Sequence, residues 1–338
     1  MATKVAINGL GRIGRATCRS IMDHPDLELV AVNDIAPPDN LAYLLRHDTV
    51  YGRFPETVDA QDSQLRIGER TIRVLQEAEP GSLPWDEMEV ELVFDCTGVF
   101  RTADDLRGHL DAGARRVVLS APAKDDTTTI VYGVNHDDAR GVDIVSCASC
   151  TTNCIAPVME VLERHLGVQK ATMTTTHAYT AGQELVDGPA SKWRRGRAAA
   201  ANIVPTSTGA AEATAKAVPA VEGRFDGVAL RVPVPVGSIA DIVCVTGRST
   251  DVEELNGIFR DEAGSDRYRG VLGVSDEPLV SSDFVADPHA AIVDLTLTRV
   301  TDGDLIKVMA WYDNEWGYAQ QMVRHAMAMV GQPSGARS

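Results

Sequence analysis

"KVAINGLGRIGRATCRSIM", residues 4–22, runs from an apolar strand pattern through a glycine turn into a helical pattern. Gly9, Gly11 and Gly14 give it the spacing G-x-G-x-x-G. The first glycine permits a tight turn, the second lets backbone approach a diphosphate, and the third lets the helix pack close to the strand. Because the turn follows a strand and opens a helix, the stretch predicts a dinucleotide site with the diphosphate at the helix N-terminus.

Asp34 lies twenty residues beyond Gly14, at the end of a second apolar run, LELVAVND (27–34). An acid at this place binds the adenosine ribose hydroxyls of a dinucleotide. A glycine turn made only for packing would not require it. The carboxylate also opposes a 2′-phosphate, so it favours NAD over NADP, although use of NADP or of both cofactors stays open.

The rest of the chain divides into two parts that differ in the length and spacing of their β runs. Short β runs separated by polar or helical segments continue up to residue 150, and they predict a parallel, doubly wound sheet. Longer, half-exposed β runs follow, and they predict a mixed or antiparallel sheet before a final amphipathic helix at 317–330. The expected fold is an α/β Rossmann dinucleotide-binding domain plus an α+β catalytic domain. The runs are 90–98, 115–122 and 127–135 in the first part and 169–180, 227–247 and 290–313 in the second.

Composition and charge narrow the functional classes. The 338 residues carry a formal net charge of −16, from 30 Asp and 18 Glu against 26 Arg and only 6 Lys. Such a field repels nucleic acid and anionic membranes, and no apolar run approaches the length of a membrane span. The first residues, MATKVAINGLG, lack the basic and apolar regions of an export signal. With six cysteines in a chain this long, we expect a reduced cytoplasmic protein without a disulfide framework.

Three cysteines, Cys147, Cys150 and Cys154, fall within SCASCTTNC (146–154). A metal site would lack a fourth ligand, since no nearby histidine supplies one, so no metal is expected. A redox pair of Cys147 and Cys150 would need a compact thioredoxin-like unit that the chain does not indicate. The apolar spacing of 150–167 places Cys150 at a helix start, where the dipole stabilises a thiolate. The pattern favours Cys150 as one nucleophile and the other two as buried bystanders.

A nucleophilic cysteine needs a base, and His177 ends the threonine-rich run TTTHAYT (174–180). A lone histidine in a strand is equally well explained as a hydrogen-bonded core residue. The residues alone therefore leave both roles of His177 open.

Taken together, the motifs resemble phosphorylating glyceraldehyde-3-phosphate dehydrogenase of the bacterial and eukaryotic type. The resemblance covers nearly the whole chain and is most specific around the reactive cysteine. The stretches that carry it are INGLGRIGR (7–15), RHDTVYGRF (46–54), DCTGVF (95–100), SAPAKD (120–125), SCTTNC (149–154), THAYT (176–180), WRRGRAAAANIVPTSTGAA (193–211), SSDF (281–284) and WYDNEWGY (311–318).

The resemblance implies a reaction on D-glyceraldehyde 3-phosphate. Cys150 attacks the aldehyde to give a thiohemiacetal, and His177 takes the proton. Hydride then passes to the nicotinamide and leaves a thioester, which inorganic phosphate cleaves to 1,3-bisphosphoglycerate.

The resemblance also implies which other residues bind. Thr180 and Arg231 match the substrate-phosphate contacts, and Arg195 lies near the anion sites. The contacts to attacking phosphate are matched by Ser149, Thr151, Thr208 and Gly209. Matches to the cofactor contacts are Arg12 and Ile13 at the diphosphate, Thr97 and Ser120 in the groove, and Asn314 and Tyr318 near the nicotinamide.

Domain limits and assembly follow from the same resemblance. We expect a cofactor domain at 1–149, completed by the helix at 317–338, and a catalytic domain at 150–316. A homotetramer is implied, with WRRGR (193–197) lining a neighbouring subunit's cofactor site rather than binding nucleic acid.

Two rival functions remain. Erythrose-4-phosphate dehydrogenase shares the cysteine, histidine and cofactor sites but releases its thioester to water. A catalytically silent dinucleotide-binding regulator is the other.

The abundance of Asp and scarcity of Lys give a testable expectation about salt. One explanation is ordinary solubility in a genome that prefers arginine codons, and the other is adaptation to high salt. Adaptation predicts that the melting temperature rises steeply with KCl, because salt screens the self-repulsion of the surface. A thermal melt that is flat from dilute to molar KCl would contradict it.

Overall fold

The computed structural model describes residues 2–330, and the chain in it divides into two compact units. The first unit comprises residues 2–130, 136–148 and 322–330 of the described chain, and the second comprises 131–135 and 149–321. Segment 131–135, which the sequence placed in the first domain, belongs to the second unit because Val131 is part of its core. Residues 331–338, the end of the expected returning helix, lie outside the described residues.

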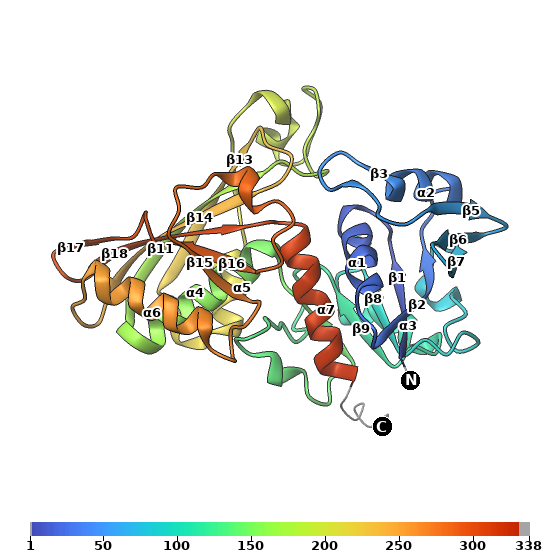
Figure 1. Ribbon diagram of the computed structural model, residues 1–338, viewed down its shortest axis with the longest axis horizontal. Helices are drawn as coiled ribbons and strands as arrows, with labels where there is room; N and C mark the ends of the chain where they lie inside the picture. The colour runs from blue at the N-terminus through green and yellow to red at the C-terminus, as the bar shows by residue number, and fades with distance from the viewer. Residues whose placement is uncertain (1, 331–338) are drawn as a thin grey trace. The chain divides into compact units, whose positions relative to one another are not determined.

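An eight-stranded sheet in the order β10-β9-β8-β1-β2-β7-β6-β5 forms the centre of the first unit (Figure 1). The pairings from β10 to β7 are parallel, as predicted, whereas β7-β6 and β6-β5 are antiparallel. The bounds are β1 Thr3–Asn8, α1 Arg12–Met22, β2 Leu27–Asn33, α2 Pro38–Arg46, β3 His47–Asp48, β4 Gly52–Arg53, β5 Val58–Gln61, β6 Gln64–Ile67, β7 Arg70–Leu75, β8 Leu92–Asp95, α3 Ala103–Asp111, β9 Arg116–Leu119 and β10 Ile144–Ser146.

One predicted strand of the first unit is wrong. Residues 127–135 form no strand, and only Thr129 makes an isolated bridge, to Ser146. The run turns instead: Gly133 has φ +79°, a conformation that side chains other than hydrogen disfavour. Its threonine and valine content matched a strand, but the glycine ends extended pairing.

The second unit has a mixed sheet in the order β12-β13-β11-β14-β18-β16-β15, with β17 paired to β18. Two pairings, β11-β13 and β15-β16, are parallel and the others antiparallel, which confirms the predicted mixed character. The bounds are α4 Cys150–Leu166, β11 Val168–Ala178, β12 Val204–Ser207, α5 Ala210–Ala217, β13 Phe225–Val232, β14 Ser238–Thr246, α6 Val252–Gly264, β15 Leu272–Ser275, β16 Ala291–Asp294, β17 Arg299–Thr301 and β18 Leu305–Tyr312. Helix α7, Trp316–Val330, begins in the second unit, and its residues from Met322 onward belong to the first. Among residues 2–330, no helix has both the length and the apolar character needed to span a bilayer.

Helix α4 is held in the second unit by apolar packing and by a network of charges. Its buried residues, among them Ile155, Met159 and Leu162, share one core with the sheet and α6. This burial of apolar surface is the main stabilising contribution to the helix position.

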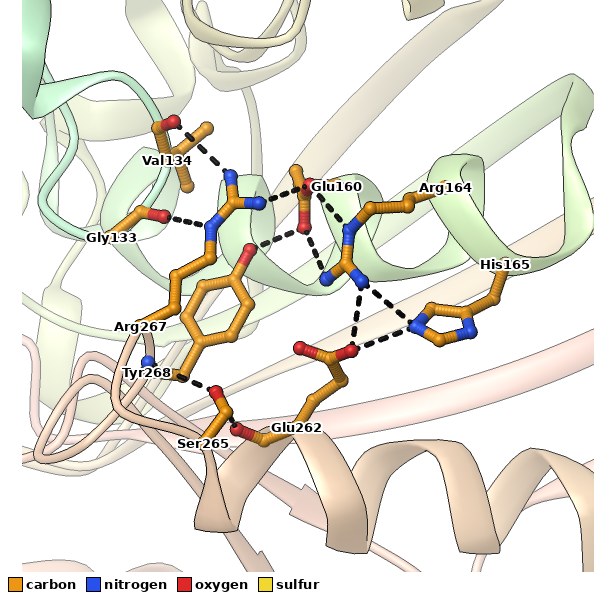
Figure 2. Close-up of polar contacts among 9 residues, drawn as sticks. All are labelled: Gly133, Val134, Glu160, Arg164, His165, Glu262, Ser265, Arg267 and Tyr268. Carbon is orange, nitrogen blue, oxygen red and sulfur yellow. Dashed lines mark hydrogen bonds and ion pairs between the residues drawn. The ribbon is translucent and has the colours of Figure 1, made fainter.

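The charged network links α4 to α6 and to the segments 133–134 and 265–268 (Figure 2). Glu160 accepts from the Tyr268 hydroxyl and pairs with Arg164 and Arg267, each at 2.9 Å. Arg164 also pairs with Glu262 of α6 at 2.9 Å. Arg267 donates to the carbonyl oxygen of Gly133 at 2.7 Å, so the network fastens segment 131–135 as well as the two helices.

Glu160→Gln tests this network. Burial acts to raise the pKa of Glu160, but hydrogen bonds from Arg164 and Tyr268 and the charge of Arg267 outweigh it and hold the pKa below its usual value. The carboxylate therefore contributes stability above about pH 4.3, its unfolded pKa, and the contribution is lost as the pH falls through the folded value. We expect a loss of about 1–2 kcal/mol in the free energy of unfolding at pH 7, because both arginines lose a partner.

Chemical denaturation at pH 7 and in acid measures this loss. Asp261→Asn, which removes the same charge from an exposed position of α6, is the matched control. A loss no larger than that of the control, or one that persists undiminished in acid, would contradict the stabilising role of the network.

Candidate active site

A pocket of about 350 Å³ lies at the carboxyl ends of the strands in the first unit. Its wall includes Gly9 and Gly11 of the glycine turn, Asp34 and Ile35 after β2, and Thr97 after β8. In a doubly wound sheet this edge is where nucleotides bind.

The three glycines fit the role that their spacing predicts. A Cβ at Gly9, which has φ +89°, would lie 2.8 Å from the backbone of Thr97, and one at Gly14 would lie 2.0 Å from the carbonyl oxygen of Gly9. Packing therefore explains these two positions. A Cβ at Gly11 would meet nothing within 4 Å, and Gly11 lines the pocket, so this glycine leaves room where a diphosphate would approach the backbone.

Asp34 is fixed by backbone hydrogen bonds at the edge of this pocket. Its carboxylate accepts from the N–H of Leu10 at 2.7 Å and from that of Ala36 at 2.9 Å. The amides of Arg12, Ile13 and Gly14 occupy the first turn of α1, where N–H groups lack partners within the helix. These residues fit a dinucleotide.

Ser120 is the predicted groove residue that does not line the pocket. It follows β9, and its N–H donates to the carbonyl oxygen of Asp95 at 2.9 Å. Its side chain is hydrogen-bonded to Cys96. Ser120 therefore supports the strand end rather than the pocket surface.

In the second unit, Cys150 is the first residue of α4, as the sequence predicts, and Ser149 caps the helix. The hydroxyl of Ser149 accepts from the N–H of Thr152 at 3.0 Å. The sulfur of Cys150 lies 3.3 Å from Nε2 of His177, near the end of β11. The structure thus brings the predicted nucleophile and base within hydrogen-bonding distance.

Arg231 contacts Nδ1 of His177, the ring nitrogen that does not face Cys150. The two residues are register partners in the parallel pair β11-β13. Nη1 of Arg231 lies 2.8 Å from Nδ1 of His177 and also 2.8 Å from the carbonyl oxygen of Ala178, which is itself 2.7 Å from Nδ1. Nε of Arg231 is buried and has no partner within the described part of the chain. A half-buried guanidinium with a free donor suits an anionic ligand.

Burial opposes charge on both members of the pair. It raises the pKa of the Cys150 thiol, an effect that the charge of Arg231 and a hydrogen bond from Thr151 oppose. Burial, reinforced by Arg231, lowers the pKa of His177 to about 3. Each group alone is neutral at pH 7. Transfer of the sulfur proton to Nε2 creates both charges together, 3.3 Å apart, where they attract each other at a helix N-terminus.

Tyr312, to which the sequence analysis assigned no role, contacts the elements on both sides of this pair. Its hydroxyl lies 3.0 Å from Oγ1 of Thr151 and 2.8 Å from Oγ1 of Thr175. Its ring meets the edge of His177, with centroids 5.9 Å apart. The end of strand β18 therefore fixes the start of α4 and the end of β11.

The other predicted anion contacts are only partly gathered around the pair. The charge of Arg195 helps to lower the pKa of His177, after burial and Arg231, so its guanidinium lies nearby. The backbone N–H of Thr180 lies 3.3 Å from Oε1 of Gln183, whose Nε2 is buried without a partner among the described residues. Thr208 and Gly209 lie at the start of α5 and line a hollow of about 610 Å³.

The predicted nicotinamide contacts, Asn314 and Tyr318, are both buried in the second unit. Oδ1 of Asn314 accepts from the N–H of Gly237 at 3.1 Å and from the hydroxyl of Ser238 at 2.9 Å. These bonds fix the orientation of the Asn314 amide.

The remaining cysteines behave as structural thiols. Cys147 and Cys154 are fully buried, and burial raises the pKa of each. Burial also raises the pKa of Cys18, Cys96 and Cys244 to about 12. Within residues 2–330, no three side chains of the metal-binding types gather into a metal site.

The fold and the site fit a dinucleotide-dependent oxidoreductase that carries a cysteine–histidine pair. Comparison with known proteins gives the family. Residues 3–103 match the NAD binding domain of glyceraldehyde 3-phosphate dehydrogenase, and residues 149–314 match the C-terminal domain of the same enzyme.

Curated relatives match over nearly their full length. Glyceraldehyde-3-phosphate dehydrogenase of Zymomonas mobilis is 46% identical over 334 residues, which cover 98% of this chain and 99% of the relative. The Mycobacterium avium enzyme is 46% identical over 339 residues, with the same coverage. Glyceraldehyde-3-phosphate dehydrogenase 2 of Streptomyces arenae is 46% identical over 326 residues, 96% of this chain and 97% of the relative. The chain belongs to the glyceraldehyde-3-phosphate dehydrogenase family, and its first domain is the NAD-binding domain of that family.

His177→Asn tests the proton transfer inferred from the pair. Without the imidazole, the sulfur proton has no acceptor, and burial keeps the pKa of Cys150 above its usual value. We expect alkylation by iodoacetamide at pH 7 to slow at least about tenfold and to rise with pH only in the alkaline range. Mass spectrometry of the peptide that contains Cys150 measures the rate, with Cys147→Ser as control. Equal rates in the wild type and His177→Asn would contradict the inference.

Proposed function

We propose that this protein oxidises D-glyceraldehyde 3-phosphate with NAD and inorganic phosphate to give 1,3-bisphosphoglycerate. The observation that carries the proposal is the contact of 3.3 Å between Sγ of Cys150 and Nε2 of His177, at the start of α4 and beside the half-buried Arg231.

The first step is addition of the thiol to the aldehyde. His177 takes the proton from Cys150 at Nε2, the sulfur attacks the carbonyl carbon, and a thiohemiacetal forms. The N–H groups of the first turn of α4 are placed to stabilise the oxygen that becomes negative. The proton on His177 is then available to that oxygen.

Arg231 has two roles in this scheme. When it donates to Nδ1 of His177, the proton of the neutral ring must lie on Nε2, and the ring cannot accept from Cys150. A substrate phosphate that binds Arg231 leaves the carbonyl oxygen of Ala178 to accept from Nδ1–H, and Nε2 becomes the base. Substrate binding would thus select the tautomer that the chemistry needs.

The second half of the reaction releases the acyl group. NAD, when bound, supplies the acceptor for the hydride that leaves the thiohemiacetal carbon. Cys150 then holds the acyl group as a thioester, with His177 taking the proton of the hydroxyl. An oxygen of inorganic phosphate attacks the thioester carbon, the carbon–sulfur bond breaks, and the thiolate leaves.

The binding residues divide between two anions. Arg231, Arg195 and Thr180 would hold the substrate phosphate, and Ser149, Thr151, Thr208 and Gly209 would hold the attacking phosphate. Gly9, Gly11, Arg12, Ile13, Gly14, Asp34 and Thr97 would hold the adenosine and diphosphate part of NAD, with Ser120 behind them. Asn314 and Tyr318 would hold the nicotinamide.

Exposed apolar residues support the homotetramer that the family implies. Leu185, Val186 and Trp193, in one loop of the second unit, are 77%, 72% and 88% exposed. Groups of this size are normally covered in a stable protein, and a second copy of the chain would cover them. The acidic composition fits a cytoplasm of high salt, where this assembly would not be opposed by charge repulsion.

Absorbance of reduced nicotinamide in molar KCl tests the proposal, with glyceraldehyde 3-phosphate and NAD or NADP, with and without inorganic phosphate. We expect sustained formation of NADH, beyond one equivalent per site, only with NAD and phosphate. We expect Cys150→Ser to be inactive and the active protein to have the mass of four chains by light scattering. Turnover without phosphate would indicate the hydrolytic erythrose-4-phosphate dehydrogenase instead. No turnover with any combination would indicate a dinucleotide-binding regulator.

A further inference from the structure

Three polar residues end three adjacent strands beneath the cofactor pocket. Asn8, Asn33 and Asp95 are the last residues of β1, β2 and β8, and Asn8 is in register with both of the others. Their exposed fractions are 2%, 4% and 0%. Buried polar groups at this place must be hydrogen-bonded, because an unpaired one is costly. We call these three residues the polar rung.

Within the polar rung, the side-chain hydrogen bonds run in one direction, from Asn33 through Asn8 to Asp95. The N–H of Glu77 donates to Oδ1 of Asn33 at 2.9 Å, and Nδ2 of Asn33 donates to Oδ1 of Asn8 at 2.7 Å. Nδ2 of Asn8 then donates to Oδ2 of Asp95 at 2.9 Å. Bonds that point the same way polarise and strengthen one another. The chain of donors ends on the carboxylate.

A second arm reaches the same carboxylate from the core. The indole N–H of Trp85 donates to Nδ1 of His109 at 3.0 Å. An indole can only donate, so Nδ1 must be the acceptor nitrogen. The proton of the neutral ring then lies on Nε2, which is 3.2 Å from Oδ2 of Asp95. Trp85 thereby fixes the tautomer with which His109 can donate to Asp95.

The carboxylate of Asp95 also binds a loop that lines the pocket. Oδ1 of Asp95 accepts from the backbone N–H of Thr97 at 3.2 Å and from its hydroxyl at 2.7 Å. With Asn8 and His109 on the other oxygen, four donors converge on Asp95, an arrangement that suits an ionised carboxylate. The backbone of Thr97 in turn lies close against Gly9.

The network joins the loops that form the pocket. Asn8, Asn33, Glu77 and Thr97 line it, whereas Trp85, His109 and Asp95 do not. The N–H of Gly9 also donates to the carbonyl oxygen of Asn33 at 2.7 Å. We infer that Trp85, His109 and Asp95 are positioning residues for NAD, which act through the polar rung to hold the glycine turn, the Thr97 turn and the Glu77 loop in the geometry that binds the cofactor. The inference rests on the cofactor site described under the proposed function.

Trp85→Phe tests the inference at the end of the network farthest from the ligand. It removes the N–H donor, so that His109 can change its tautomer. Calorimetric titration is expected to show the dissociation constant for NAD raised about three- to tenfold, the loss expected for one hydrogen bond. In turnover, the KM for NAD is expected to rise while kcat stays unchanged, because no reacting atom is touched.

Val90→Ala is the matched control. Val90 packs in the same apolar cluster as Trp85 but makes no side-chain hydrogen bond. The Val90→Ala variant should lower the melting temperature at least as much as Trp85→Phe does. Its dissociation constant for NAD should stay within about twofold of the wild-type value. The inference is overturned if the two variants change NAD binding equally at equal loss of stability.

Asp95→Asn is the second variant. It keeps the shape of the side chain but replaces an acceptor with a donor, so that at least one of the four donors meets another donor. We expect the dissociation constant for NAD to rise more than in Trp85→Phe. A smaller rise in the dissociation constant than in Trp85→Phe would contradict the central place of Asp95 in the network. If Asp95→Asn does not fold, the comparison of Trp85→Phe with Val90→Ala still tests the inference.

Failure of this inference can be told apart from failure of the proposed reaction. The inference is measured by NAD binding in the absence of substrate and phosphate. The reaction is measured by turnover and depends on Cys150, whose alkylation by iodoacetamide should be the same in Trp85→Phe and in the wild type.

Discussion

The contact between the sulfur of Cys150 and the ring of His177 is the constraint on which the second unit depends. It requires the first residue of α4 and the end of β11 to meet within 3.3 Å, although 27 residues separate them in the sequence. Apolar packing fixes the length of α4 against the sheet, and the Glu160 network fixes its far half to α6 and to segment 131–135. Tyr312 fixes its near end through Thr151. The site is therefore held from both ends of the helix.

The burial of Cys150 and His177 explains why several elements of the fold are needed to position these two side chains. A thiol and an imidazole out of water resist charge, and the structure opposes a charge on either alone. The chemistry needs a thiolate only at the moment of attack. The fold provides this by placing the two groups together at a helix N-terminus, with Arg231 close enough to favour the thiolate and to respond to an anionic substrate. The same principle governs the polar rung, where Asp95 is buried because four donors surround it.

Local sequence was sufficient to predict the features that depend on neighbouring residues. The glycine turn, the position of Asp34 directly after β2 and the start of α4 at Cys150 all follow from spacing within about twenty residues. Features made by distant residues could not be predicted in this way. Arg231 and His177 are 54 residues apart in the sequence, and strand pairing brings them into contact. Glu160 and Glu262 are linked only through Arg164, which pairs with both. The antiparallel strands β5 and β6 and the turn at 127–135 were missed because their short runs fit more than one structure.

Acyl transfer through Cys150 is the central claim, and mass spectrometry of the quenched enzyme tests it most directly. The protein would be mixed with glyceraldehyde 3-phosphate and NAD in phosphate-free molar KCl, quenched in acid and digested. The account predicts a 3-phosphoglyceroyl group on the peptide that contains Cys150, which disappears when inorganic phosphate is added before the quench. An unmodified Cys150 under these conditions, or an acyl group on another cysteine, would contradict it.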